Sequence, residues 1–355
     1  MIRAPLSVGI AGFGIVGQKR FGLIKENSLF KVVSVSDVRF QDAEFREDAS
    51  RLIADDEVSI HYHFSDLLKE DLDVVFVSLP NHLAPEATMG GLKKGCHVFC
   101  EKPPGRTVED IRNVIKIENE NPGLKLKYGF NHRYHGSVDE AKKIVDSGQF
   151  GEILNFRGIY GKSSIVPFSG GWRCERKYAG GGILLDQGIH MLDMLRFFHG
   201  DFDDIHSFVS NAYWQHDIED NAFAILRDDR GVVASVSSSA TQWQHRFRLE
   251  IALREGSLEL SGILSGSKSY GEEKLKIIPR TKSSMKGSVQ ENILSYLEDN
   301  SWKNEIDEFA DLILEDQPVE NGKSEDALEV MKMVYRVYYA DSEWRDKFQI
   351  PNPDA

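Results

Sequence analysis

The chain has few cysteines, no long apolar run and a negative net charge, and each of these properties excludes a class of protein. Three cysteines among 355 residues are too few for a disulfide framework, so we expect a reducing, cytoplasmic compartment. No apolar run approaches the ~20 residues of a membrane-spanning helix, and the first residues lead into a strand pattern rather than a secretory signal. A formal net charge of −13 disfavours a nucleic-acid backbone as partner. We therefore expect neither a membrane nor a nucleic-acid partner.

The length and the order of elements predict two domains. A chain of 355 residues exceeds one ordinary core. Residues 1–131 alternate strand-like and helical runs, beginning with an apolar strand over Leu6–Ala11, which predicts an α/β domain with a doubly wound parallel sheet. Residues 132–355 contain long runs of period two, an apolar helix over Leu184–Phe198 and a helical end, Trp302–Asp346. This pattern predicts an α+β domain with a large, mostly antiparallel open sheet.

A glycine cluster follows the first predicted strand. Gly12-Phe13-Gly14-Ile15-Val16-Gly17 lies between that strand and a helix, the context that a dinucleotide-binding turn requires. The first glycine permits a tight turn, the second removes a side chain where pyrophosphate approaches, and the third lets helix and strand pack closely. The helix start then presents N–H groups and a positive dipole end to phosphate. The alternative is a plain structural turn.

An acidic residue stands where such a fold holds the adenosine ribose. Asp37 ends the second predicted strand, 20 residues after Gly17, as the ribose-binding acid does. A carboxylate there favours NAD, because it repels a 2′-phosphate. Arg39 keeps NADP open as the alternative cofactor, since its guanidinium is suited either to stacking on adenine or to binding that phosphate.

Two further stretches contain candidate catalytic groups. Lys102, in Cys-Glu-Lys-Pro-Pro, follows a predicted parallel strand at the end where ligands bind in open α/β sheets. Asp186 and His190 are four residues apart, which places them on one face of the predicted helix, with Asp193 on the same side. The alternatives are a solvated strand-end lysine, a helix-surface pair, or a metal pair, for which the sequence offers no third ligand.

Together these residues resemble the glucose–fructose oxidoreductase, inositol dehydrogenase and MocA-type family of NAD(P)-dependent sugar oxidoreductases. The resemblance covers nearly the whole chain and rests on six motifs in order: the glycine fingerprint, Ser78–Asn81, Glu101–Pro103, Gly129–Arg133, Gly171–Arg173 and the helix with Asp186 and His190. It implies that Lys102 contacts the substrate hydroxyl and the nicotinamide, that His190 accepts the proton, and that Asp186 orients the substrate. It also implies a homodimer or homotetramer that associates through the sheet of the second domain.

The motifs and the resemblance give a complete list of expected contacts, with no metal. The expected cofactor contacts are Gly12, Phe13, Gly14, Ile15, Val16, Asp37, Arg39, Ser78, Pro80, Asn81, Glu101 and Lys102. The expected substrate contacts are Lys102, Asn131, Arg133, Trp172, Arg173, Asp186 and His190.

The expected chemistry is oxidation of a secondary alcohol or the reverse reduction. Histidine is suited to moving the hydroxyl proton near neutral pH, and a lysine ammonium stabilises developing alkoxide charge. The nicotinamide carries the hydride. This interpretation requires that the amine of Lys102 and the imidazole of His190 both reach one carbinol beside the nicotinamide.

The loop after the predicted strand at Asp73–Pro80 departs from the family pattern. Many members have Pro-Asn-x-x-His there, but this chain has Ala84 at the histidine position and a histidine, His82, two residues earlier. The role of that loop in cofactor contact is therefore open, whereas the catalytic set is complete.

A local basic run precedes the predicted catalytic helix. Arg173, Arg176 and Lys177 are either solvated loop charges or part of a pocket for phosphate or carboxylate, with Arg173 the best candidate for a bidentate contact. We therefore expect a sugar, a sugar derivative or a nucleotide-linked sugar as substrate. The alternative function is a non-catalytic protein of the same fold that binds NAD(P) as a sensor.

Overall fold

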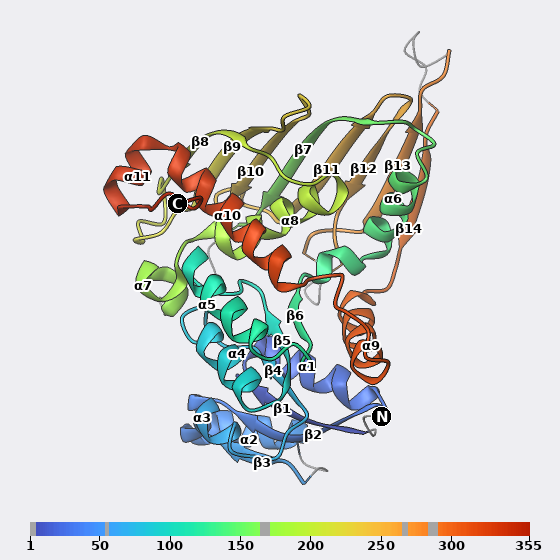
Figure 1. The fold of residues 1–355 in the computed structure, drawn as a ribbon. Coiled ribbons are helices and arrows are strands. Elements are labelled where there is room, and N and C mark those ends of the chain that lie inside the picture. The colour runs from blue at the N-terminus through green and yellow to red at the C-terminus, as the bar shows by residue number, and fades with distance from the viewer. Residues whose placement is uncertain (1–4, 54–56, 164–170, 265–268, 283–289) are drawn as a thin grey trace. The chain divides into compact units, whose positions relative to one another are not determined.

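The fold was analysed in a computed structural model that describes residues 5–53, 57–163, 171–264, 269–282 and 290–355 (Figure 1). The chain forms two compact units: residues 1–130 with 302–328, and residues 131–301 with 329–355. The sequence predicted a single boundary, with all of 132–355 in the second domain. Residues 302–328 instead return to the first unit, because helix α9 (Ser301–Leu314) buries Ile306, Phe309 and Ile313 in the core of the first sheet.

The first unit contains the predicted doubly wound sheet. Its six strands have the order β3-β2-β1-β4-β5-β6, and every neighbouring pair is parallel. The order reverses beside β1, so β1 and β4 flank the switch point at which such sheets bind ligands. The strands are β1 (Leu6–Ala11), β2 (Phe30–Ser36), β3 (Ser59–His61), β4 (Val74–Val77), β5 (His97–Glu101) and β6 (Leu126–Gly129).

Helices pack on this sheet as its apolar strands require. Helices α1, α2 and α9 share one core cluster with β1, β2, β4 and β5, while α4 packs against α5 and against β4 and β5. Thr107 and Asp110 have the Thr-x-x-Asp spacing of a capping-type helix start, and they form a capping box at the start of α5. The Asp110 N–H donates to Thr107 Oγ1 at 3.1 Å, and the Thr107 N–H donates to Asp110 Oδ2 at 3.1 Å. The helical segments are α1 (Ile15–Glu26), η1 (Val38–Gln41), α2 (Ala43–Ile53), α3 (Phe64–Leu67), α4 (Ala84–Lys93), α5 (Val108–Asn119) and α9.

The second unit contains the predicted large sheet, whose order is β14-β13-β12-β11-β7-β10-β9-β8 in eight strands. Its pairs are antiparallel except β7 with β10, which are parallel. The sequence did not predict β13 or β14, nor β3 in the first unit. The strands are β7 (Ile153–Gly161), β8 (Asp204–Ser210), β9 (Asn221–Arg227), β10 (Val233–Ser239), β11 (Arg246–Leu253), β12 (Gly256–Ser261), β13 (Glu273–Pro279) and β14 (Asn292–Tyr296).

One face of this sheet is covered by helices (Figure 1). Helix α6 packs on β12 and β13, α8 packs on β7, and α10 is tied to β8 where the Ser207 hydroxyl donates to the Val337 carbonyl at 2.6 Å. Along β9 the side chains alternate between buried and exposed, so the opposite face stays open. The helical segments are η2 (Asn131–Tyr134), α6 (Gly136–Asp146), η3 (Trp172–Cys174), α7 (Arg176–Ala179), η4 (Leu184–Gly188), α8 (Ile189–Phe198), α10 (Ser324–Ala340) and α11 (Ser342–Phe348).

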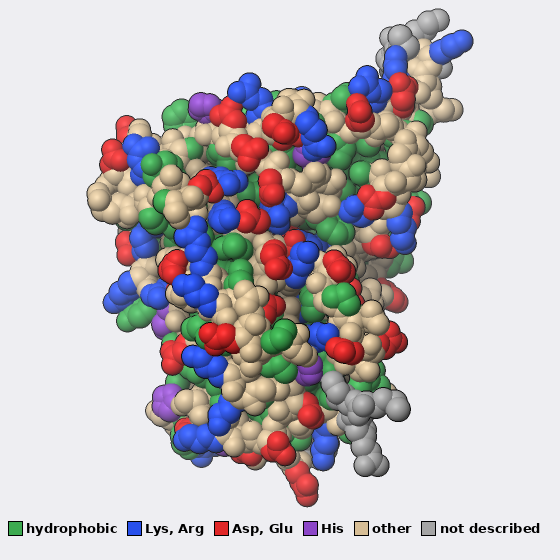
Figure 2. Space-filling model, in the orientation of Figure 1, with side chains coloured by type: hydrophobic (Ala, Val, Ile, Leu, Met, Phe, Trp, Pro, Cys, Tyr) green, Lys and Arg blue, Asp and Glu red, His purple; other side chains and the backbone are tan. Residues whose placement is uncertain are grey.

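Three surface and core properties accompany this fold. Cys96, Cys100 and Cys174 are all buried thiols. Among the described residues, no helix has the length and apolar character needed to cross a membrane. Basic and acidic side chains are interspersed over the face shown in Figure 2.

Candidate functional site

The glycine turn after β1 is shaped by close backbone approach. Gly12 has a φ of +93°, and a Cβ there would collide with the Ser78 carbonyl oxygen; a Cβ at Gly17 would collide with the carbonyl oxygen of Gly12. Among the described residues no side chain caps α1 at Gly14, so its first N–H groups lack intrahelical acceptors and favour an anion. The Ile15 side chain is 90% exposed at this helix start, whereas Phe13 is buried and offers only its backbone.

The carboxylate of Asp37 is held beside this turn. It accepts hydrogen bonds from the Phe13 N–H at 2.9 Å and from Arg39, through Nε at 2.9 Å and Nη2 at 2.8 Å. Burial acts to raise the pKa of Asp37, but the hydrogen bonds from Arg39 and Phe13 outweigh it and lower the pKa. The group is therefore a carboxylate at neutral pH, in the place predicted for the ribose-binding acid.

The ends of β4 and β5 lie next to the glycine turn, because β1, β4 and β5 are neighbours in a parallel sheet. Ser78, directly after β4, has a buried hydroxyl for which the described residues supply no hydrogen-bond partner. The Pro80 carbonyl accepts from the N–H groups of Leu83 at 2.8 Å and Ala84 at 3.1 Å, which closes the turn that holds the buried Asn81. Ala84 is the buried first residue of α4.

Lys102 follows β5 at this same edge and is half-buried. The side chain of its neighbour Glu101 accepts a hydrogen bond from Arg20 Nε at 2.6 Å, and Arg20 Nη2 also donates to Glu305 of α9 at 2.6 Å. The cofactor contact expected of Glu101 stays a prediction. The Arg20 and Glu305 side chains are fully buried, and that of Glu101 is 11% exposed. The Glu101 side chain therefore holds the end of β5 in place, and with it the backbone of Lys102, the next residue.

The predicted catalytic helix begins differently from the prediction. Residues Leu184–Gly188 form a π-helical turn, and the α-helix α8 begins only at Ile189. Because a π turn has a longer repeat than an α turn, the expected i, i+4 relation of Asp186 and His190 on one regular face is wrong. The Asp186 side chain is 32% exposed and lies 3.8 Å from the Lys162 ammonium, whereas His190 is 2% exposed.

A buried carboxylate that the sequence analysis missed holds this turn. Glu219 accepts hydrogen bonds from the backbone N–H groups of Gly182 at 2.7 Å and Leu184 at 3.0 Å, and from the Tyr338 hydroxyl at 2.6 Å. A Cβ at Gly182 would collide with the Glu219 carbonyl oxygen. Burial raises the pKa of Glu219. This anchor positions the segment that carries Asp186 and His190.

The ring of His190 lies in an aromatic stack within the second unit. The His132 ring is parallel to it, with centroids 3.6 Å apart and planes 16° apart. The Tyr160 ring lies beside them, and its hydroxyl is 3.1 Å from His132 Nε2. Tyr160 and Lys162 were not predicted, although their spacing on β7 and the residue after it places both on the helix-covered face.

Two residues predicted to contact the substrate have side chains that bind protein groups inside the second unit. The Arg133 guanidinium forms a bidentate ion pair with Asp193, at 3.0 Å from Nε and 2.6 Å from Nη2, and these side chains are 5% and 0% exposed. The Asn131 amide Nδ2 donates to the Ser301 hydroxyl at 3.2 Å. These contacts hold η2 in place, and the substrate contact predicted for both side chains stays a prediction.

The three basic residues before the π turn, Arg173, Arg176 and Lys177, make different contacts. Arg176 donates to the carbonyls of Asp217 and Gly180 and lies 4.1 Å from the centre of the Phe348 ring, so it is structural. Lys177 pairs with Glu175 at 3.0 Å on the surface. The half-buried Arg173 stacks on Trp172, with 4.2 Å between the guanidinium carbon and the ring centre, which leaves its N–H edge as the best anion-binding candidate of the three.

Two known family domains match this chain. Residues 6–130 match the oxidoreductase family domain with an NAD-binding Rossmann fold, and residues 138–259 match the GFO/IDH/MocA C-terminal domain. The chain belongs to the GFO/IDH/MocA family. The predicted resemblance and the predicted NAD-binding domain are thereby confirmed.

Several known proteins are similar to this chain. Levoglucosan dehydrogenase of Pseudarthrobacter phenanthrenivorans is 32% identical over 45% of this chain and 42% of its own length. D-glucoside 3-dehydrogenase of Escherichia coli is 33% identical over 56% of each. The chain thus spans about half the length of the curated relatives that it matches. The structure of levoglucosan dehydrogenase with NADH has a TM-score of 0.81 at 21% identity, over 96% of this chain and 97% of that one, and shares the fold.

The residues at the switch point fit the dinucleotide that this GFO/IDH/MocA domain binds. The glycine cradle admits no side chain, the start of α1 is uncapped among the described residues, and the Ser78 hydroxyl is buried without a partner there. The carboxylate of Asp37 has the chemistry for a ribose diol. Gly12 to Val16, Asp37, Ser78 and Lys102 would therefore hold the cofactor.

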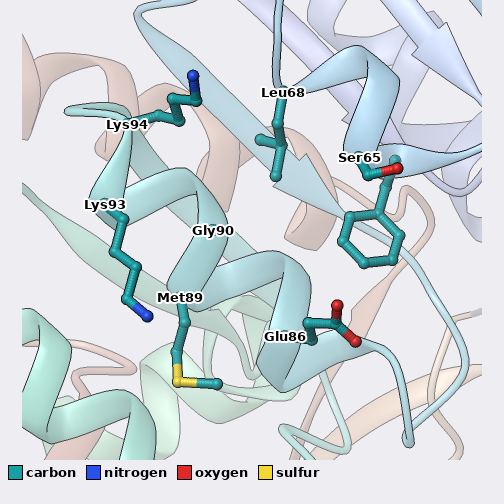
Figure 3. Close-up of a pocket in the computed structure, with 8 residues that line it drawn as sticks. Ser65, Leu68, Glu86, Met89, Gly90, Lys93 and Lys94 are labelled. Carbon is teal, nitrogen blue, oxygen red and sulfur yellow. The ribbon is translucent and has the colours of Figure 1, made fainter.

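A separate hollow lies between α3 and α4 (Figure 3). It measures about 400 Å³ and is lined by Phe64, Ser65, Leu68, Glu86, Met89, Gly90, Lys93 and Lys94. None of the family-motif residues lines it. The hollow is therefore distinct from the cofactor site.

Proposed function

We propose that the protein is an NAD(P)-dependent oxidoreductase that interconverts a secondary alcohol and a ketone on a sugar or sugar derivative. The observation that carries this proposal is the gathering of the glycine turn, Asp37, Ser78 and Lys102 at one edge of the parallel sheet. The names of the relatives, levoglucosan dehydrogenase and D-glucoside 3-dehydrogenase, support a carbohydrate as the substrate class.

The chain's residues supply the proton chemistry. In the oxidation, His190 takes the hydroxyl proton, and the Lys102 ammonium stabilises the negative charge that develops on oxygen. Asp186 orients the sugar through its hydroxyl groups. Bound nicotinamide supplies the hydride acceptor. In the reduction the same groups act in reverse, with His190 returning its proton to the oxygen.

Isotope transfer tests this function. The protein is incubated with NAD⁺ and a panel of sugars that carry deuterium at ring carbinol carbons. The proposal expects deuterium in the reduced nicotinamide, detected by mass spectrometry. Deuterium that stays on every sugar, with both NAD⁺ and NADP⁺, would overturn it.

The Asp37 carboxylate is expected to set the cofactor preference for NAD. Hydrogen bonds to a charged group contribute about 1.5–3 kcal/mol, so Asp37→Ser should raise the KM for NAD⁺ roughly 10- to 100-fold. The same change removes the charge that repels a 2′-phosphate and should improve the use of NADP⁺. Steady-state kinetics with both cofactors checks this, and Arg51→Ala, which removes an exposed ion pair with Glu47 on α2, serves as the control. A wild-type preference for NADP⁺ would contradict the assignment.

We further propose that Arg173 binds an anionic group of the substrate, as in a nucleotide-linked sugar. Its guanidinium rests on Trp172, which orders the side chain before a ligand arrives. The sugar panel therefore includes charged and neutral members. We expect Arg173→Ala to raise the KM far more for a charged sugar than for a neutral one, and equal effects on both would contradict the proposed role of Arg173.

The open face of the second sheet is proposed to bind a second copy of the chain. Phe208, Phe223 and Ile225 are 80%, 48% and 52% exposed, and Phe208 lies opposite Phe223 in the β8–β9 pair. An apolar sheet face of this kind is typical of an interface. Because a two-fold interface uses the same patch on both copies, Phe208→Glu should break it.

Light scattering coupled to size exclusion measures the result. The wild type is expected as a dimer or tetramer and the Phe208→Glu variant as a smaller species. Ile60→Lys, on β3 of the other unit, is the matched control and should leave the mass unchanged. A monomeric wild type at micromolar concentration would contradict the proposed assembly.

A further inference from the structure

A continuous chain of hydrogen bonds runs into the His132 ring. The Ser301 hydroxyl donates to Asp299 Oδ1 at 2.6 Å, and the Asn131 amide Nδ2 donates to the Ser301 oxygen at 3.2 Å. The Asn131 amide oxygen lies 3.3 Å from His132 Nδ1. Because the carboxylate of Asp299 only accepts hydrogen bonds, the orientation of the Asn131 amide follows from it, and His132 Nδ1 must be the donor to the amide oxygen.

The other nitrogen of His132 meets a phenol. Tyr160 OH lies 3.1 Å from His132 Nε2, and burial raises the pKa of Tyr160 well above its ordinary value. The phenol therefore keeps its proton. A neutral His132 ring protonated at Nδ1 offers Nε2 as an acceptor for that proton, in competition with the Tyr270 hydroxyl, which also raises the pKa of Tyr160. With Nδ1 protonated and Nε2 accepting, both nitrogens of a neutral His132 ring are satisfied.

A charged His132 would be costly in this environment. The ring is 6% exposed, the two hydrogen bonds described above join it to a neutral amide and a neutral phenol, and its face lies against His190. A second proton on the ring would turn the hydrogen of Tyr160 away from His132 Nε2 and toward Tyr270. It would also place a buried cation against the His190 ring. Burial disfavours that cation, and the two rings would repel each other if both were charged.

We propose that this hydrogen-bond chain holds His132 neutral as its Nδ1–H tautomer, so that His190 is the only member of the stacked pair that takes up a proton. His132 is then a positioning residue. As a device for the acid–base step the inference rests on the proposed function, although the protonation states themselves do not.

The charged groups around the pair are consistent with this assignment. The His135 ring meets the edge of His132 at a centroid distance of 5.5 Å, and His135 Nδ1 lies 2.8 Å from Glu273 Oε2. Burial acts to raise the pKa of Glu273, but its hydrogen bond with His135 lowers it overall. Among the described residues, Arg133 pairs with Asp193, and Lys162 lies 3.8 Å from Asp186. His245 stacks on Tyr270, and burial, with a smaller effect of Lys162, lowers the pKa of His245. Tyr270 packs against Tyr160.

Histidine NMR on the full-length protein tests the proposal. Nitrogen-15 shifts report which ring nitrogen carries hydrogen, and a titration from pH 5 to 8 reports which ring gains a second. We expect His132 to show a protonated Nδ1 and no titration, and His190 to titrate. A titrating His132, or one protonated at Nε2 alone, would overturn the proposal.

Two variants separate charge from packing. Asn131→Asp places a carboxylate at His132 Nδ1; His132 should become charged and lower the pKa of His190 by about one unit. His132→Phe keeps an aromatic ring without a proton and should leave the pKa of His190 within about half a unit. A larger rise in His132→Phe would mean that His132 carries charge in the wild type, which contradicts the proposal.

The pH dependence of kcat/KM then tests the role in the reaction. In the Asn131→Asp variant, the limb of the kcat/KM profile that the protonation of His190 controls should shift to lower pH, as the pKa of His190 does in the NMR titration. If the NMR results are as expected but no sugar is turned over, the proposed function fails while the assignment of the proton to His190 stands.

Discussion

Replacing His190 with asparagine is expected to lower kcat by about 10²- to 10⁴-fold, the usual contribution of a general acid or base. Asparagine keeps a polar side chain at this 2% exposed position but cannot exchange a proton near neutral pH. The dissociation constant for NAD⁺ should change less than about threefold, because the residues proposed to bind the cofactor belong to the first unit. Steady-state kinetics and cofactor fluorescence titration check the two expectations.

A matched control is available on the same helix. Met191 is buried beside His190, and Met191→Leu is nearly volume-conserving, so it should retain kcat within a few-fold. If His190→Asn retained kcat as well, His190 would not be the acid or base. If both variants lost activity, the loss would reflect disruption of α8 rather than loss of a proton carrier.

Replacing Arg20 with methionine is expected to destabilise the first unit by roughly 3–5 kcal/mol. The change leaves the carboxylates of Glu101 and Glu305 without their shared cation, and Arg20 and Glu305 are fully buried. Because Glu101 directly precedes Lys102, kcat should fall as well. Urea unfolding measures the stability. Arg51→Met, which removes an exposed pair with Glu47, is the control and should change stability by less than about 1 kcal/mol.

The same cluster gives the stability a dependence on pH. Burial raises the pKa of Glu305 from 4.5 to about 7, against the opposing attraction of Arg20. Between pH 4.5 and about 7 the folded state keeps a proton on Glu305 that the unfolded state has lost. The contribution of Glu305 therefore makes the free energy of unfolding fall as the pH rises through this range. Glu305→Gln should flatten that fall. An Arg20→Met variant as stable as the wild type would contradict the role of the cluster.

The local signals in the sequence were sufficient for much of the fold. The glycine spacing, Asp37 and the Thr107–Asp110 capping box are short-range patterns, and the structure contains each of them. The period-two runs of the second half predicted its large sheet. In each case the deciding residues lie within a few positions of one another, or at the fixed spacing of one strand–helix–strand unit.

The errors concern contacts between residues distant in the chain or local changes of helical repeat. Arg20 and Glu101 are 81 positions apart and Arg133 and Asp193 are 60 apart, so no local pattern shows that these side chains pair. The apolar face of α9 predicts a buried helix but not which sheet buries it. The π turn at Leu184–Gly188 preserves the apolar composition of an α-helix, so the sequence pattern did not distinguish them.

We propose that this GFO/IDH/MocA protein transfers hydride between a sugar carbinol and nicotinamide, and that Lys102 assists this transfer. The most direct measurement follows the absorbance of reduced nicotinamide while the wild type and the Lys102→Ala variant are mixed with NAD⁺ and a broad sugar panel. We expect turnover of at least one sugar by the wild type and a loss of about 10²-fold or more in the variant. Tight cofactor binding by the wild type with no turnover of any sugar would contradict the account and indicate a protein that senses the cofactor.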